Sequence, residues 1–173
     1  MQIIPYIEID GTWTFTDTEI KSYFYYMQQE KTAKKVFHGG AVKDSSQFLT
    51  YLKSPANHTI IIINEERQPI MLAWLNGVED KRAWFSFNVF KNFWGKKSIE
   101  AICLARDYWM NMQDNRGQFI FNVLMGVTPS NNRLALRMMK LCGATSLEEI
   151  PDFMTNFWTG ERVGGIFSYF GRT

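Results

Sequence analysis

The sequence predicts one α/β (α+β) domain over residues 1–173, with helices flanking a mixed, mostly antiparallel central sheet. Apolar and polar residues alternate over Ala83–Phe90, which is typical of a half-buried strand. Two β-branched, apolar runs precede this strand, and residues with helical spacing follow it. A length of 173 residues with 46% apolar and 21% charged residues fits a single domain with a sizeable core.

The first third of the chain is predicted to form a strand and two helices. Ile3–Ile9 is expected to be a strand, and Pro5 places it at a sheet edge. The sequence Thr-Asp-Thr-Glu is a capping box, and it predicts a helix over Asp17–Gln29. The basic segment Glu30–Val42 ends in His-Gly-Gly and is expected to be a loop. A second helix begins after a cap at Asp44 or Ser45.

Three successive strands are predicted next. Thr59–Asn64 is rich in β-branched residues, and Ile70–Val78 returns after a polar turn, so the two form a hairpin. A second polar turn leads into Ala83–Phe90. The chain thus contains a three-stranded meander that ends at a turn bearing glycine and lysine.

The predicted order then alternates between helix and strand. Ile99–Met112 is expected to be a helix and Gln118–Val127 a strand, with a further helix that ends at Gly143 as a left-handed cap. Ser146–Val163 is expected to be a long loop. Ile166–Phe170 is the last predicted strand, and its aromatic residues would cover a sheet edge or pair with a second copy. The sequence leaves a monomer and a homodimer equally open.

The turn between the third strand of the meander and the next helix could hold a phosphorylated ligand. It carries Gly95, Lys96, Lys97 and Ser98 immediately before the predicted helix. The first N–H groups of a helix have no partner within it, and the helix dipole favours an anion there. The alternative is an ordinary surface turn with solvated lysines.

Composition excludes several classes of protein. The net charge of +2 is too small to indicate nucleic-acid binding, although the basic segment Lys31–Lys43 keeps that as a weaker alternative. Cys103 and Cys142 fall in predicted helices and are expected to be buried thiols. No Cys/His cluster predicts a metal site, and no signal peptide or membrane span is evident. We therefore expect a cytoplasmic protein without a metal.

Two motifs resemble those of the GNAT acyltransferase superfamily. The segment Val89–Lys97 is similar to the pyrophosphate loop of that family, whose pattern is Gln or Arg, two residues, Gly, one residue, then Gly or Ala. Its Trp-Gly-Lys core is most similar to the branch that acetylates ribosomal-protein N-termini. The segment Asn132–Ala144 resembles the family's Asn, helix, Gly-Phe motif with the same Asn-to-Gly spacing. The resemblance covers residues 59–145 and implies a sheet splayed between its fourth and fifth strands.

The chain departs from the family pattern at four positions. Asn92 stands where the pattern has Gln or Arg, and Lys97 stands where it has Gly or Ala. Ala144 replaces the usual Phe. Met139 occupies the position at which many members carry a general-acid Tyr. A chain this divergent also suggests a phage or mobile-element source.

The resemblance implies acetyl-CoA as co-substrate. Backbone groups of Phe87, Asn88 and Val89 would pair with the pantetheine arm, and an N–H near Val89 would polarise the thioester. The remaining residues implied to bind the cofactor come from the turn and the following motif: Asn92, Phe93, Trp94, Gly95, Lys96, Lys97, Ser98, Asn132 and Arg133.

The resemblance implies transfer of an acetyl group to a primary amine of a small molecule or a protein. Candidate general bases are Glu79, Asp80 and His38, although the two acids are also ordinary turn residues and His38 an ordinary loop residue. The departures from the motifs also suit a second hypothesis, a catalytically inactive GNAT-like scaffold that acts as a binding protein.

Overall fold

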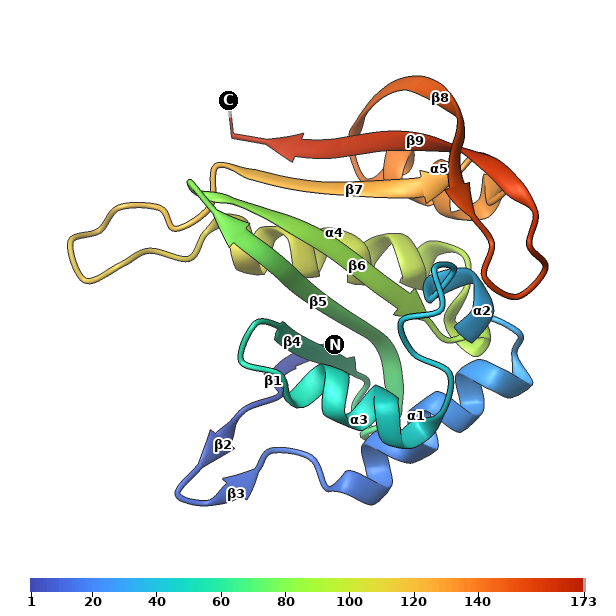
Figure 1. Ribbon diagram of the computed structural model, residues 1–173. Coiled ribbons are helices and arrows are strands. Elements are labelled where there is room, and N and C mark those ends of the chain that lie inside the picture. Colours follow the sequence, from blue (N-terminus) through green and yellow to red (C-terminus); the bar gives the residue numbers. More distant parts are fainter. Residues whose placement is uncertain (173) are drawn as a thin grey trace.

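The computed structural model describes residues 1–172, which form a seven-stranded sheet with helices on both faces (Figure 1). The strand order is β1-β4-β5-β6-β7-β9-β8, and each neighbouring pair is antiparallel except β6 and β7. This confirms the predicted mixed, mostly antiparallel sheet. The strands are β1 (Gln2–Pro5), β4 (His58–Ile63), β5 (Pro69–Glu79), β6 (Arg82–Val89), β7 (Val123–Pro129), β8 (Thr145–Thr155) and β9 (Arg162–Gly171).

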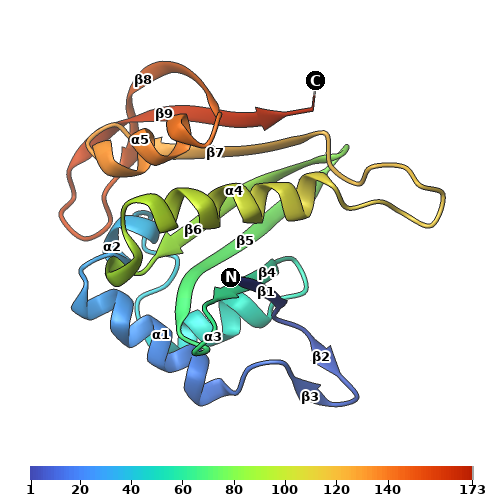
Figure 2. The same ribbon diagram turned by 180° about the vertical axis from the view of Figure 1, so that it is seen from behind.

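The helices form two layers around this sheet. They are α1 (Asp17–Gln29), α2 (Ala33–Val36), α3 (Ser45–Lys53), α4 (Lys96–Met110) and α5 (Arg133–Leu141), with a 3-10 turn η1 (Lys91–Phe93). Helices α1 and α3 pack on one face, and α4 covers the other (Figures 1 and 2). Within the part of the chain described, no helix has the length and apolar character needed to cross a membrane.

Each face of the sheet has its own apolar core. Trp74 and Phe24 belong to the cluster under α1 and α3, whereas Trp109 and Leu124 belong to the cluster under α4. The buried isoleucines of β4 contribute alternately to the two clusters, Ile60 and Ile62 to one and Ile61 and Ile63 to the other, because successive strand residues point to opposite faces. The sheet is therefore packed on both of its faces.

Several predicted helix ends are confirmed. Thr16 accepts a hydrogen bond from the N–H of Glu19, and the Glu19 carboxylate accepts one from the N–H of Thr16. Asp44 caps α3 by accepting from two backbone N–H groups. Gly143, with φ of 84°, follows α5 in the left-handed conformation.

The N-terminal prediction was partly wrong. β1 ends at Pro5, and the following residues form a separate hairpin of β2 (Glu8–Ile9) and β3 (Thr12–Trp13). The chain turns there because Asp10 and Gly11 both have positive φ. The predicted loop Glu30–Val42 also contains a helix, the single turn α2.

Three further boundaries were also wrong. α4 begins at Lys96, so the lysines lie in its first turn and not before it. The predicted strand Gln118–Val127 begins only at Val123, because Asp114 accepts hydrogen bonds from the N–H groups of Arg116 and Gln118 and closes a turn. The predicted loop Ser146–Val163 is largely strand β8.

β8 is an edge strand that could not be recognised from the sequence. All of its residues except Met154 are exposed, so it shows no apolar alternation. Pro151 is tolerated because the strand pairs on one side only. The predicted last strand, Ile166–Phe170, lies within β9, between β7 and β8. It is therefore an interior strand, and the exposed sheet edge belongs to β8.

The predicted splay is present between β6 and β7, the fourth and fifth strands of the large sheet. Their parallel register covers only Arg82–Trp84 against Val123–Met125. Beyond these three pairs the two strands diverge, and α2 and α5 lie at the open end (Figure 1). The splay breaks the sheet where backbone groups would otherwise be paired.

Candidate functional site

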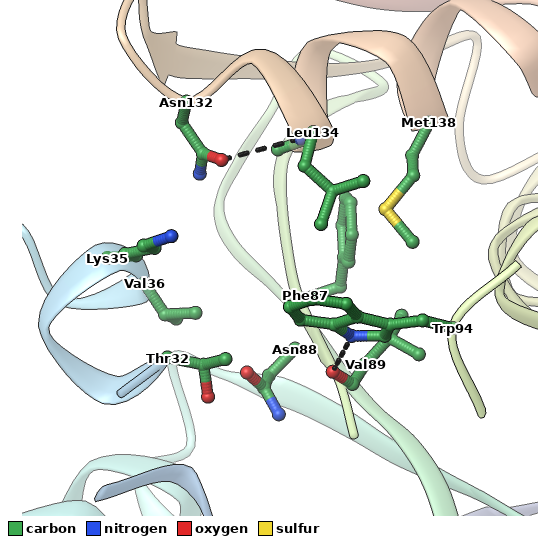
Figure 3. A pocket seen from close by; sticks show the side chains of 11 residues that line it. Thr32, Lys35, Val36, Phe87, Asn88, Val89, Trp94, Asn132, Leu134 and Met138 are labelled. Carbon is green, nitrogen blue, oxygen red and sulfur yellow. Dashed lines mark hydrogen bonds between the residues drawn. The ribbon is translucent and has the colours of Figure 1, made fainter. Parts of the chain in front are cut away.

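A cleft occupies the gap between the diverging strands (Figure 3). One wall is the end of β6 and the other is the end of β7 with the start of α5. Trp94 and one side of α2 complete the walls. The lining side chains with polar groups are Thr32, Lys35, Ser86, Asn88, Trp94, Thr128 and Asn132, and the rest are apolar.

Backbone groups of β6 face this cleft. The N–H of Phe90 donates to the carbonyl of Ile70 on β5, directly beyond the registered pair of Met71 and Val89. Hydrogen-bonded and non-hydrogen-bonded pairs alternate along an antiparallel ladder, so Phe87 and Val89 direct their N–H and C=O groups away from β5. These groups point toward β7, which has already diverged. Phe87 and Val89 therefore present unpaired backbone groups to a ligand.

Trp94 uses one of these groups. Its indole Nε1 donates to the carbonyl of Val89 at 3.0 Å, and its ring extends over the cleft (Figure 3). The side chain is 40% exposed, so no tight packing holds it in place. Of the predicted backbone contacts, the Val89 carbonyl is thus occupied in this conformation, whereas no residue between 1 and 172 accepts from the Phe87 or Val89 N–H.

The start of α4 provides the predicted anion-binding geometry. Gly95 is the N-cap, with φ of 99°, and no side chain caps the helix. The first three N–H groups, those of Lys96, Lys97 and Ser98, are consequently free to bind an anion. The Ser98 hydroxyl is turned inward and donates to the carbonyl of Gly95 at 2.6 Å.

Contrary to the prediction, the side chains around this helix start do not gather at one site. Lys96 lies 3.8 Å from Glu100 and remains exposed. Lys97 lies over the ring of Phe93 and lines a different hollow, with Glu65 and Glu66 of the β4–β5 turn. Asn92 is exposed in η1 and does not line the cleft. The free N–H groups, more than the lysine side chains, define this part of the site.

The second motif lies on the opposite wall. Asn132 caps α5 by accepting a hydrogen bond from the N–H of Ala135 at 3.4 Å, and its side chain lines the cleft. Arg133 is exposed and does not line it. Met138 faces the cleft, whereas Met139 is buried in the core under α4. Of the two residues of this motif that were predicted to bind the cofactor, Asn132 therefore lines the cleft and Arg133 does not.

One wall of the cleft comes from α2, a helix that was not predicted from the sequence. Thr32, Lys35 and Val36 line it from the α1–α3 side of the sheet. Asn88 lies on this side too, is 3% exposed, and its Nδ2 has no hydrogen-bond acceptor. The signal was present in the sequence, because Ala33–Val36 follows a possible Thr cap, but four residues give too little periodicity to identify a helix.

Two of the predicted bases lie far from the cleft. Glu79 and Asp80 are in the turn between β5 and β6, at the end of β6 where the strands still pair. Both are exposed and lie near Arg82, at 3.2 Å and 3.9 Å. Since the cleft opens at the other end of β6, neither carboxylate is brought to it.

His38 lies where the α2 loop meets the connection between β8 and β9. Its carbonyl accepts from the N–H of Phe157, and the indole of Trp158 donates to the neighbouring carbonyl of Phe37 at 3.2 Å. The imidazole is 6% exposed, and neither ring nitrogen has a partner. Burial lowers the pKa of His38, although the nearby Glu161 carboxylate opposes this shift.

A parallel strand pair that splays beside an uncapped helix start is the architecture of the GNAT N-acetyltransferase fold. Solved structures confirm this assignment of fold. A single-substitution variant of the spermidine N-acetyltransferase SpeG from Vibrio cholerae superimposes with a TM-score of 0.73 at 11% identity, over 99% of this chain and 95% of that one. The structure of the spermidine N-acetyltransferase from Vibrio cholerae in complex with CoA and spermine gives a TM-score of 0.72 at 11% identity, over 98% and 95%.

Sequence comparison adds nothing to this structural likeness. No family model matches the chain, and no curated protein is significantly similar to it in sequence. At 11% identity the likeness establishes the fold alone.

Proposed function

We propose that this protein is an acetyl-CoA-dependent N-acetyltransferase that acts on a primary amine. The observation that carries the proposal is the cleft in which Phe87 and Val89 direct unpaired backbone N–H groups between two diverging strands. The likeness to spermidine N-acetyltransferases, one of them solved with CoA, supports the same class of reaction.

Acetyl-CoA would lie along β6, with its phosphates at the start of α4. The amides of its pantetheine arm would pair with Phe87 and Val89 as an added strand does. The pyrophosphate would accept from the free N–H groups of Lys96, Lys97 and Ser98. Asn132 would contact the arm from the opposite wall. Trp94 would move aside, because its ring covers the carbonyl of Val89.

The reaction would proceed by direct attack of the amine on the thioester. The amine nitrogen forms a bond to the acetyl carbon, the carbon–sulfur bond breaks, and the CoA thiolate takes up a proton. A backbone N–H of Phe87 or Val89 would stabilise the negative charge on the carbonyl oxygen, an effect worth about 3 kcal/mol where such donors have been removed. The amine would enter from the α2 side, opposite α4 and α5.

The amine must lose a proton before it attacks. Of the three predicted bases, we retain His38 and not the carboxylates of the β5–β6 turn. Burial lowers its pKa, which favours the neutral imidazole, and it lies in the loop that follows α2. A water molecule would connect it to the amine, since the imidazole does not itself line the cleft.

Two classes of amine acceptor are compatible with the proposed reaction. The similar solved enzymes are named for spermidine, whereas the Trp-Gly-Lys sequence suggests a protein N-terminus. A cytoplasmic location and a homodimer also remain predictions. Edge strand β8 is the element that a second copy would use, because its outer backbone groups are unpaired.

A non-catalytic CoA-binding scaffold is the second candidate. Two observations favour it: no tyrosine lines the cleft among residues 1–172, and Met139, at the position of the family's acid, is buried in the core. Such a scaffold would bind CoA without releasing a free thiol in the presence of amines.

The test combines calorimetry with a thiol-release assay. Acetyl-CoA should bind with a dissociation constant in the micromolar range, and thiol should be released when primary amines are added. Binding without release over a broad amine panel would favour the scaffold. Absence of binding at millimolar acetyl-CoA would contradict both candidates.

A further inference from the structure

The acceptor side of the cleft carries a positive charge that no acid balances. Lys35 lines both halves of the cleft, and it is the one charged side chain to do so among residues 1–172 (Figure 3). It makes no ion pair with any residue the structure describes. An unpaired lysine on a binding cleft attracts an anion to it.

The surrounding segment has the same sign. Residues 31–43 contain four lysines and no acidic residue. Two of the other lysines lie over aromatic rings of the β8–β9 connection, Lys34 over Trp158 and Lys43 over Phe157. Glu161 is the acid whose charge acts on His38, but it does not line the cleft. The approach to the cleft from α2 is therefore positive.

A second, independent feature is a buried donor without an acceptor. The side chain of Asn88 lines the cleft beside Thr32 and is 3% exposed, and its Nδ2 has no acceptor. A buried donor without a partner is costly, so a ligand that brings an acceptor oxygen gains from it. Lysine and amide together favour a ligand that carries oxygen anions.

We infer that the acceptor is a primary amine that also carries an anionic group, a carboxylate or a phosphate, which Lys35 binds. This inference rests on the proposed acetyl transfer. It distinguishes the protein from the spermidine N-acetyltransferases whose fold it shares, since spermidine is a polycation and Lys35 would repel a second ammonium group. Lys35 thus acts in acceptor selection and takes no part in the bond changes.

Three amines of equal chain length test the inference: 4-aminobutyrate, butylamine and 1,4-diaminobutane. They end in a carboxylate, a methyl group and a second ammonium, and otherwise match. We expect kcat/KM to fall in that order, with about tenfold between the carboxylate and the methyl compound, as for a hydrogen bond between charged groups. Aminoethyl phosphate against ethanolamine tests the phosphate in the same way.

Lys35→Ala should abolish the preference for 4-aminobutyrate mainly through KM, with acetyl-CoA affinity unchanged, and Lys35→Glu should reverse it toward the diamine. Lys34→Ala is the matched control, because it removes the same charge from the same helix but its side chain lies over Trp158. It should keep the order of the three amines.

Turnover that favours 1,4-diaminobutane, or an order that Lys35→Ala leaves intact, would overturn the inference and leave acetyl transfer standing. If acetyl-CoA binds but none of the amines reacts, calorimetry on the CoA-loaded protein decides. Tighter binding of 4-aminobutyrate than of the diamine, lost in Lys35→Ala, supports the inference, and equal or weaker binding contradicts it. Failure of acetyl-CoA to bind contradicts the proposed function itself.

Discussion

Trp94 shows how one side chain can control access to a backbone site. Its indole N–H satisfies the Val89 carbonyl in the absence of ligand, and Lys91 lies over its ring at 5.6 Å. A pantetheine amide would have to displace it. The Val89 carbonyl is therefore covered by a single hydrogen bond, which typically contributes about 1 kcal/mol.

Trp94→Phe should therefore bind acetyl-CoA more tightly. The phenyl ring keeps an aromatic surface but cannot donate to the carbonyl, so the dissociation constant should fall about fivefold, the equivalent of one hydrogen bond. Calorimetry measures this directly. Trp84→Phe is the control, since Trp84 lies on β6 at a position where β6 and β7 still pair. Weaker binding by Trp94→Phe would mean that the indole is part of the ligand site.

Asn132 caps α5 and, in the proposed function, also contacts the acyl carrier, and substitutions can separate these two roles. Asn132→Asp keeps an oxygen to cap α5, so thermal stability should stay close to wild type, whereas Asn132→Ala should cost about 1 kcal/mol. Both remove the amide donor on the cleft wall and should lower kcat/KM about tenfold. Thermal unfolding together with initial rates separates the effects. Full activity in Asn132→Asp would exclude a contact between the amide and the acyl carrier.

The boundaries of the elements leave the start of α4 without a side-chain cap. The helix begins directly after Gly95, which has a positive φ, and no side chain caps the first N–H groups. The chain also ties this region to α1, because Glu30 accepts from the N–H of Lys91 at 3.0 Å. The proposed phosphate site would thus depend on where elements begin more than on lysine side chains.

Gly95→Ala should weaken acetyl-CoA binding at least about fivefold, because alanine disfavours this backbone conformation and shifts the helix start. No atom lies within 4 Å of the added Cβ, so the cost of about 1–2 kcal/mol is conformational. Gly143→Ala is matched: its φ is also positive and its Cβ would meet only ordinary contacts. It should lose similar stability and keep its affinity. Equal losses of affinity in both would contradict a site at α4.

The Glu30 carboxyl makes stability pH-dependent. Burial raises its pKa above the ordinary value of 4.5, and its Oε2 has no partner. Its stabilising contribution is thus complete below the unfolded pKa and is lost as pH rises through the folded pKa. Glu30→Gln keeps an acceptor for Lys91 and should unfold at higher temperature than wild type at pH 7, with the gap closing toward pH 4. Exposed Glu66→Gln should show no gap, and a constant gap would contradict the explanation.

Elements with strong local signals were predictable, and those without them were not. The capping box fixed the start of α1, and the β-branched run fixed β4. The prediction of β8 failed because an exposed edge strand needs no alternation of apolar and polar residues. The prediction of α2 failed because a single turn shows no helical periodicity. The structure alone could show that Glu79 lies at the closed end of β6 and that Lys35 reaches the cleft, since both depend on packing between distant segments.

At the scale of the molecule, the sheet consists of two parts that meet at three residue pairs of β6 and β7. The wedge between them leaves the backbone groups of Phe87 and Val89 without a partner strand. A ligand that pairs with these groups would extend the ladder and join the two parts. The splay was expected from the resemblance to the GNAT superfamily, whereas the position of Trp94 within it was not.

Hydrogen exchange at two amides tests the central claim most directly. In 15N-labelled protein, the N–H groups of Phe87 and Val89 face the cleft and should exchange readily without ligand. Saturating CoA should slow both about tenfold or more, as expected for newly paired amides, and leave those of β1 unchanged. If CoA binds and these two amides keep their exchange rates, or if CoA does not bind at all, the cleft between β6 and β7 is not the acyl-carrier site.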